Sequence, residues 1–141
     1  MNLTSSECKK IILEEAAKLG IEDIGIASIA IVDDIAQRQF DTWIENSHHG
    51  EMHYLDKYHD VRQNPELLFP SARSIIVCAI NYHPRQKQPA DAPQIASYAL
   101  GKDYHEVVRA KLSILANFIS SNFGGETRVC VDTAPLRERY W

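Results

Sequence analysis

The sequence has little cysteine and no long apolar run, and both shortages limit what the chain can be. Its three cysteines, Cys8, Cys78 and Cys130, are widely spaced and each lies among apolar neighbours. This pattern favours reduced core thiols over disulfides or a metal–thiolate site. No stretch approaches the roughly 18–20 apolar residues of a membrane span, and residues 1–20 alternate charged with apolar positions, unlike a signal peptide. We therefore expect a cytoplasmic chain with no membrane partner.

The length and charge predict one domain that does not hold a large nucleic acid by itself. The chain has 141 residues, of which 45% are hydrophobic and 24% are charged, enough for one core and too few for two comfortable ones. Its net charge of −4 argues against tight binding of nucleic acid by this chain alone. The basic residues Lys9, Lys10, Arg137 and Arg139 are expected to be solvated surface charges.

Apolar spacing predicts helices and strands in alternation. Helical periodicity, with Ser5 or Ser6 as the first cap and Gly20 as the first stop, predicts helices over residues 5–19, 33–44 and 104–123, with a short helical piece near 52–58. Short apolar runs predict strands at residues 23–27, 74–80 and 129–131. The run at 74–80 reads as a central strand covered on both faces, and residues 84–93 read as an exposed loop. The expected class is α+β with α/β-like features: a small mixed sheet with helices on both faces, in one domain.

A carboxylate at the end of the last predicted strand is the first candidate for chemistry. Residues 129–131 lead directly into Asp132, and the carboxyl ends of strands are where α/β folds place reacting groups. The alternative is structural. Thr133 and Pro135 have the chemistry of a helix N-terminus, so Asp132 could simply cap a helix that begins at Pro135.

Three ordered motifs resemble a known enzyme family. They are Asn64–Ile76, Ile95–His105 and Val131–Leu136. Together they resemble epoxyqueuosine reductase, the cobalamin-dependent enzyme of tRNA queuosine synthesis. The resemblance runs from about Ile21 to Trp141 and covers the N-terminal part of that family.

The resemblance also implies what this chain does not contain. The family carries two 4Fe-4S clusters, whose ligands come in cysteine runs that three dispersed cysteines cannot supply. The resemblance therefore implies that residues 1–141 form a single N-terminal domain, truncated before a ferredoxin-like cluster domain. We expect this part alone to be catalytically inactive and to bind cobalamin weakly or not at all, because contacts from the other half are missing.

For the full-length family the resemblance implies reduction of epoxyqueuosine to queuosine in tRNA. Asp132 would be the proton donor, and general acid catalysis of this kind typically contributes about 10²- to 10⁴-fold. A carboxyl group in water is ionised at neutral pH, so such a donor needs burial against the cofactor. The residues that would face cobalamin are Arg62, Ala96, Tyr104, His105, Asp132 and Arg139.

Each of these assignments has a plainer alternative. Arg62 and Arg139 could be surface charges, and Tyr104 with His105 could be an aromatic cluster at a helix start. Ala96 would offer only its backbone, and Ser97 stands where an arginine is common in the family, which weakens the case for side-chain contacts from that loop.

Two histidines invite a metal hypothesis that the sequence does not complete. His49 and His53 have the i, i+4 spacing that places two ligands on one helix face, but the sequence fixes no third ligand near them. We therefore predict no metal site; a polar entry to a helix after Gly50 accounts for both residues.

Two other functions remain open. The chain could be a stand-alone corrinoid-binding or interaction domain without turnover. It could also be a reductive dehalogenase-like relative with another substrate, because a fold and a cofactor site do not fix the substrate.

Overall fold

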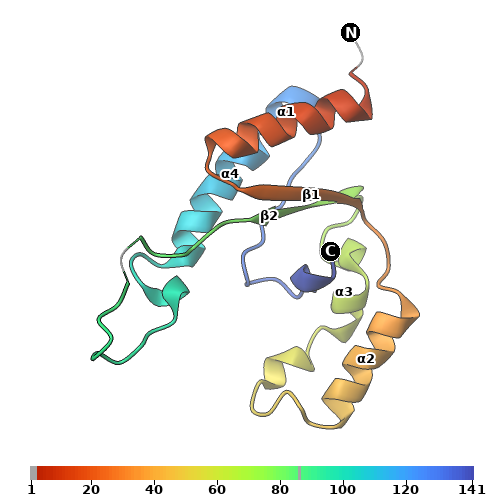
Figure 1. Cartoon of the computed structure of the whole chain (residues 1–141). Helices are drawn as coiled ribbons and strands as arrows, with labels where there is room; N and C mark the ends of the chain where they lie inside the picture. Colours follow the sequence, from red (N-terminus) through yellow and green to blue (C-terminus); the bar gives the residue numbers. More distant parts are fainter. Residues whose placement is uncertain (1–2, 86) are drawn as a thin grey trace. The chain divides into compact units, whose positions relative to one another are not determined.

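The structure, a computed structural model, describes residues 3–85 and 87–141 and combines helices with one small sheet (Figure 1). The α-helices and strands are α1 (Ser5–Lys18), β1 (Asp23–Ser28), α2 (Asp34–Glu45), α3 (His59–Gln63), β2 (Ser74–Ala79) and α4 (Tyr104–Phe123). Short 3₁₀ helices cover His53–Leu55, Pro65–Leu67, Ser97–Ala99 and Glu138–Tyr140. The expected α+β class is confirmed. Among the described residues, no helix has the length and apolar character needed to cross a membrane.

The two strands pair with each other in opposite directions. The N–H of Glu22 donates to the carbonyl of Ala79 at one end, and the N–H of Ile29 donates to the carbonyl of Arg73 at the other, each over 3.1 Å. Bonds that link the start of one strand to the end of the other define an antiparallel pair. β2 is half-buried along its central residues, so the expectation of a strand covered on both faces is wrong.

The chain divides into two compact units whose segments alternate along the sequence. The first unit comprises the residues up to Gly25 together with Cys78–Thr133. The second comprises Ile26–Val77 and Ala134–Trp141.

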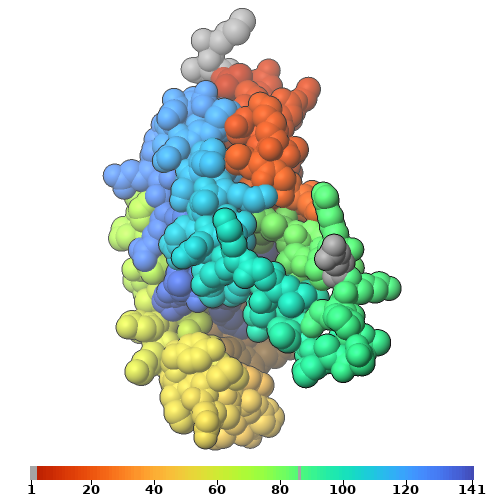
Figure 2. All heavy atoms as spheres, turned by 90° about the vertical axis from the view of Figure 1, so that its left-hand side faces the viewer, coloured from red at the N-terminus to blue at the C-terminus, as the bar shows by residue number. Residues whose placement is uncertain are grey.

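In the first unit α1 and α4 lie side by side (Figures 1 and 2). The apolar stripe that repeats along each helix explains this packing, because it gives each helix one face to bury. A further bond ties the pair, since the Lys111 ammonium on α4 donates to the carbonyl of Leu19 at the end of α1 over 2.8 Å. The buried apolar side chains of this unit are Ile12, Ala16, Ile21, Leu115 and Val131.

Local chemistry sets both ends of α1. Thr4 and Glu7 form a capping box, in which the Thr4 hydroxyl accepts from the N–H of Glu7 and the Glu7 carboxylate accepts from the N–H of Thr4. The cap therefore lies one residue before the expected Ser5. At the other end Gly20 has φ +68°, a conformation that favours glycine, and a Cβ there would lie 3.1 Å from the Lys111 ammonium.

In the second unit the chain's last residues dock on the start of α2. Asp33 caps α2 by accepting from the N–H groups of Ile35 and Ala36, each over 2.9 Å. The Tyr140 hydroxyl donates to Asp33 over 2.9 Å, and the Arg137 guanidinium donates to the Ala36 carbonyl over 2.8 Å. The prediction that Arg137 is a solvated surface charge is therefore wrong.

Two elements predicted near the C-terminus are absent from the described structure. Residues 129–131 form no strand, and no α-helix begins at Pro135. A strand needs a neighbour to satisfy its backbone groups, and the described sheet contains β1 and β2 only. Asp132 has φ +50° and Thr133–Pro135 form a bend, so Asp132 caps no helix. The predicted loop at 84–93 is largely exposed, apart from Gln86, which lies outside the described residues.

The inward face of α4 should carry much of the first unit's stability. Leu115 is 2% exposed, whereas its neighbour Ile114 is 54% exposed. Leu115→Ala is expected to lower the free energy of unfolding by about 2–5 kcal/mol because it leaves a cavity. Ile114→Ala is the matched control and should change it by no more than about 0.5 kcal/mol. Urea denaturation followed by circular dichroism measures both, and equal losses would contradict the packing described for α4.

Candidate active site

A hydrogen bond joins the two most suggestive residues of the sequence. The Tyr104 hydroxyl donates to the Asp132 carboxylate, although 28 positions separate them. Tyr104 is the first residue of α4 and is half-buried, whereas Asp132 is exposed on the irregular segment that follows Val131. Val131 is buried, so the chain is anchored immediately before the carboxylate. The backbone therefore presents Asp132 outward while Tyr104 fixes its direction.

The contact changes the acidity of the tyrosine. The hydrogen bond to Asp132 raises the pKa of Tyr104 to about 12, because ionisation would remove the bond and place a phenolate beside a carboxylate. Tyr104 therefore stays a hydrogen-bond donor throughout the physiological range. The carboxylate therefore has a neutral donor, the Tyr104 hydroxyl, among its partners.

Aromatic rings surround this bond on the Tyr104 side. The His105 ring stacks on Tyr104 with centroids 4.1 Å apart and planes inclined by 28°, and Tyr98 meets Tyr104 edge-on at 5.8 Å. Asp103 caps α4 by accepting from the N–H of His105 and also lies 2.8 Å from the His105 Nδ1. The backbone bond, followed by the bond from the imidazole, holds the pKa of Asp103 below its usual range. The cluster thus combines a stacked pair of rings with a third ring set edge-on, and two carboxylates lie beside it.

Two further positions of the first unit, one on a loop and one on α4, lie near these residues in the sequence or in space. Ala96 is exposed and directly precedes the 3₁₀ helix Ser97–Ala99, where its carbonyl accepts from the N–H of Ala99 over 2.9 Å. Arg109, which the sequence did not single out, donates to the Thr133 hydroxyl over 3.3 Å. Arg109 lies on α4, and its contact with Thr133 spans 24 positions. No local pattern in the sequence could have revealed this contact.

The two predicted arginines belong to the second unit. Arg62 is half-buried in α3, and its guanidinium donates to the carbonyls of Tyr54 and Lys57 over 3.4 Å each. Burial lowers the pKa of Arg62 below its usual value. Arg62 therefore braces the preceding turn and is more than a surface charge. Arg139 is exposed in the 3₁₀ helix Glu138–Tyr140.

An open groove runs along α2 in the same unit. Its volume is about 450 Å³, and its lining residues are Ile35, Arg38, Gln39, Thr42, Trp43, Asn46 and His48. None of the residues predicted to be catalytic or to face a cofactor lines it. The groove therefore adds nothing to the candidate site.

Comparison with known proteins identifies relatives of this chain. The family described as epoxyqueuosine reductase QueG, DUF1730, matches residues 62–133, just over half of the 141 residues. A protein from Cellulophaga algicola named epoxyqueuosine reductase is 35% identical over 98% of this chain and 45% of its own length. The chain thus spans less than half the length of this relative.

Solved structures of relatives have the same fold. The crystal structure of an epoxyqueuosine reductase with a tRNA-Tyr epoxyqueuosine-modified stem loop matches with a TM-score of 0.76 and 29% identity, over 96% of this chain and 37% of the other. A Bacillus subtilis epoxyqueuosine reductase, described with an aspartate-bearing catalytic loop swung out of the active site, matches with a TM-score of 0.67 and 25% identity. That match covers 84% of this chain and 33% of the other.

The Tyr104–Asp132 bond predicts an unusual titration. Tyr104 should ionise near pH 12, and Asp132→Asn should return its pKa toward the ordinary value of about 10. Asp103→Asn, which removes a more weakly coupled carboxylate, is the control and should leave most of the shift. NMR of ¹³C-labelled tyrosine resolves the individual rings.

The same shift has a consequence for stability with a definite sign. The folded pKa of Tyr104 lies above the unfolded value, so the contribution of this bond is fully present below about pH 10 and is lost as the pH rises through about 12. Titration of Tyr104 near pH 10 in the unaltered chain would contradict the contact.

Proposed function

Because the chain belongs to the epoxyqueuosine reductase QueG family, we propose that it is the N-terminal, cobalamin-binding part of an enzyme that reduces epoxyqueuosine to queuosine in tRNA. The family match and the fold of the relatives support this assignment. The other part of the enzyme would carry the two 4Fe-4S clusters.

The observation that carries the proposal is the exposed carboxylate of Asp132, held by Tyr104. A general acid must point at the atom it protonates, and orientation by a neutral donor allows the acid to change charge without losing its partner. Asp132 has φ +50°, a left-handed conformation that aspartate tolerates better than most residues, so the backbone holds it without marked strain. The catalytic loop of the Bacillus subtilis relative is named for an aspartate, which agrees with this role for Asp132.

The reaction explains why an acid is needed. Conversion of an epoxycyclopentane to the alkene breaks two C–O bonds, consumes two electrons and two protons, and releases the oxygen as water. An alkoxide is a poor leaving group unless it is protonated as its bond breaks. Asp132 would deliver a proton to this oxygen, and Tyr104 would act as a positioning residue that holds the carboxyl group in place.

The residues present fit a large, flat cofactor of the corrin type. Tyr104 and His105 stack on each other and provide aromatic surface, and Asp132 stands exposed where a cofactor could cover it and reduce its contact with water. In this proposal Ala96 contributes its backbone. Arg62 and Arg139 belong to the second unit, and their proposed role, to donate to the amides or phosphate of the cofactor, comes from the family resemblance alone. Bound cobalamin would supply low-potential electrons, replenished by the clusters of the other part.

The substrate would be tRNA that carries epoxyqueuosine, as in the relative solved with a modified stem loop. The net charge of −4 means that this chain alone offers little attraction for the phosphate backbone, so most of the affinity for tRNA should come from the other part. An enzyme of tRNA maturation would act in the cytoplasm.

Replacement of Asp132 tests the proposal. The test uses a chimera in which the remainder of the Cellulophaga algicola relative follows Trp141. Asp132→Asn in this chimera should reduce the single-turnover rate by roughly 10²-fold or more, because the amide cannot deliver the proton, while cobalamin binding stays nearly unchanged. Asp132→Ala should behave likewise.

The control is Glu126→Gln, which removes a charge at an exposed position of the same unit. It should leave both the rate and the melting temperature close to those of the unaltered chimera. A near-normal rate in the Asp132→Asn chimera would reduce Asp132 to a structural residue and remove the catalytic assignment.

A further inference from the structure

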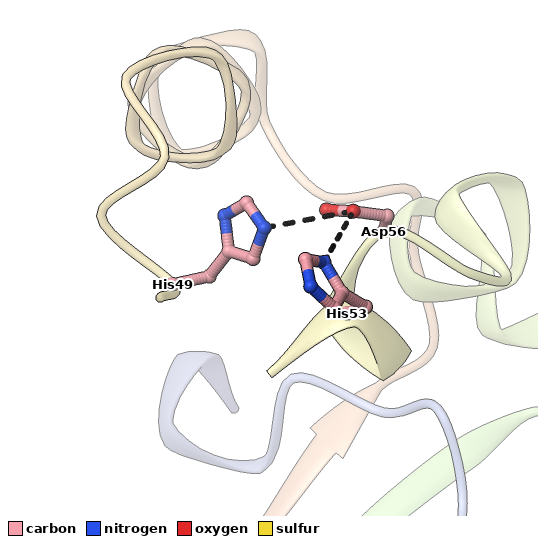
Figure 3. A group of neighbouring side chains, drawn as sticks. All are labelled: His49, His53 and Asp56. Carbon is pink, nitrogen blue, oxygen red and sulfur yellow. Dashed lines mark ion pairs between the residues drawn. The ribbon is translucent and has the colours of Figure 1, made fainter. Parts of the chain in front are cut away.

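Three side chains of the second unit converge just after α2. His49 lies in the turn that follows the helix, His53 opens the 3₁₀ helix His53–Leu55, and Asp56 follows that helix directly (Figure 3). The chain reverses at Gly50, whose φ of +57° favours glycine. This turn, and not the continuous helix face that the i, i+4 spacing suggested, brings the two imidazoles together.

The atoms that could act as ligands face one another. The Asp56 Oδ2 lies 3.6 Å from the His49 Nε2 and 4.0 Å from the His53 Nδ1. One ligand atom from each of the three residues lies within 4.8 Å of the other two. Figure 3 shows both rings directed at the carboxylate between them. Asp56 is the third ligand that the sequence alone did not reveal.

The His49 imidazole is buried without a hydrogen bond. Its side chain is 7% exposed, and its Nδ1 has no hydrogen-bond partner in the described structure. Its Nε2 faces Asp56 across 3.6 Å, which is longer than an ordinary hydrogen bond. Burial holds the ring with its Nε2, and not the unpartnered Nδ1, directed at Asp56, so Nε2 is the atom available to a ligand.

A divalent metal ion fits the gap. Zinc binds imidazole nitrogen and carboxylate oxygen at roughly 2.0–2.2 Å in tetrahedral geometry, which places neighbouring ligand atoms about 3.3 Å apart. The observed separations need a closure of no more than about 1.5 Å by the same comparison. His53 and Asp56 can provide it, because their side chains are 75% and 43% exposed, whereas His49 is fixed by burial.

We infer that His49, His53 and Asp56 bind a divalent transition metal of the zinc class, with a fourth position open to water. The ion links the turn after α2 to the 3₁₀ helix His53–Leu55 and the residue that follows it. Arg62 donates to the carbonyls of Tyr54 and Lys57 on the same stretch, so this link also steadies the support of Arg62. None of the three ligands has a role of its own in the proposed reductase chemistry.

Zinc titration of the tag-free, chelator-treated 141-residue chain tests the site. Competition with a chromophoric chelator should show one equivalent of zinc bound, and saturating zinc should raise the melting temperature. Cobalt(II) bound in the same place should give the visible absorption of a tetrahedral ion.

Variants separate this site from other zinc ligands. His53→Ala and Asp56→Asn alter exposed side chains, so they should fold, and each should weaken zinc binding by at least about tenfold. His48→Ala removes the exposed neighbouring histidine and is the matched control, with affinity expected within about twofold of the unaltered chain. The inference is wrong if no equivalent of zinc binds, or if His53→Ala and Asp56→Asn bind zinc as tightly as the unaltered chain.

Discussion

The hydrogen bond from Tyr104 to Asp132 is the constraint on which the candidate site depends. The segment after residue 128 belongs to no described strand or α-helix, so no ladder of backbone bonds sets the direction of Asp132. Burial of Val131 places the segment, and Tyr104 then orients the carboxylate. Because Tyr104 opens α4, the start of that helix is as important to the site as the loop that bears the acid. The packing of α4 on α1, together with the Lys111 bond, therefore supports the geometry of the candidate site from a distance.

Local signals in the sequence predicted most of the helices. The features that were not predicted depend on contacts between residues far apart in the sequence. Periodicity and caps are encoded within a few residues, so α1, α2 and α4 were found nearly to the residue, with the first cap at Thr4 and not at Ser5. A strand at 129–131 depends on a partner elsewhere in the chain, which apolar composition cannot reveal. Arg137 looked like a surface charge because its partners on α2 lie about a hundred positions away.

The site was predicted in parts and assembled only by the structure. Tyr104, His105 and Asp132 were each identified from motifs. The hydrogen bond between Tyr104 and Asp132 spans 28 positions, so no local pattern in the sequence predicts it. Arg62 is half-buried, and its guanidinium is hydrogen-bonded to two carbonyls of the preceding turn. These bonds favour a fixed guanidinium over a mobile one. The pair His49 and His53 was recognised by spacing, yet the turn at Gly50 decided which third residue joins it.

A double-mutant cycle on the single-turnover rate tests most directly whether Tyr104 positions a catalytic Asp132. Tyr104→Phe, Asp132→Asn and their combination are compared in the chimera with the remainder of the Cellulophaga algicola relative. If Tyr104 acts through Asp132, Tyr104→Phe should slow the reaction by about tenfold alone, and by no more than about twofold in the Asp132→Asn background. Effects that multiply would contradict the account, because they would show that the two residues act independently.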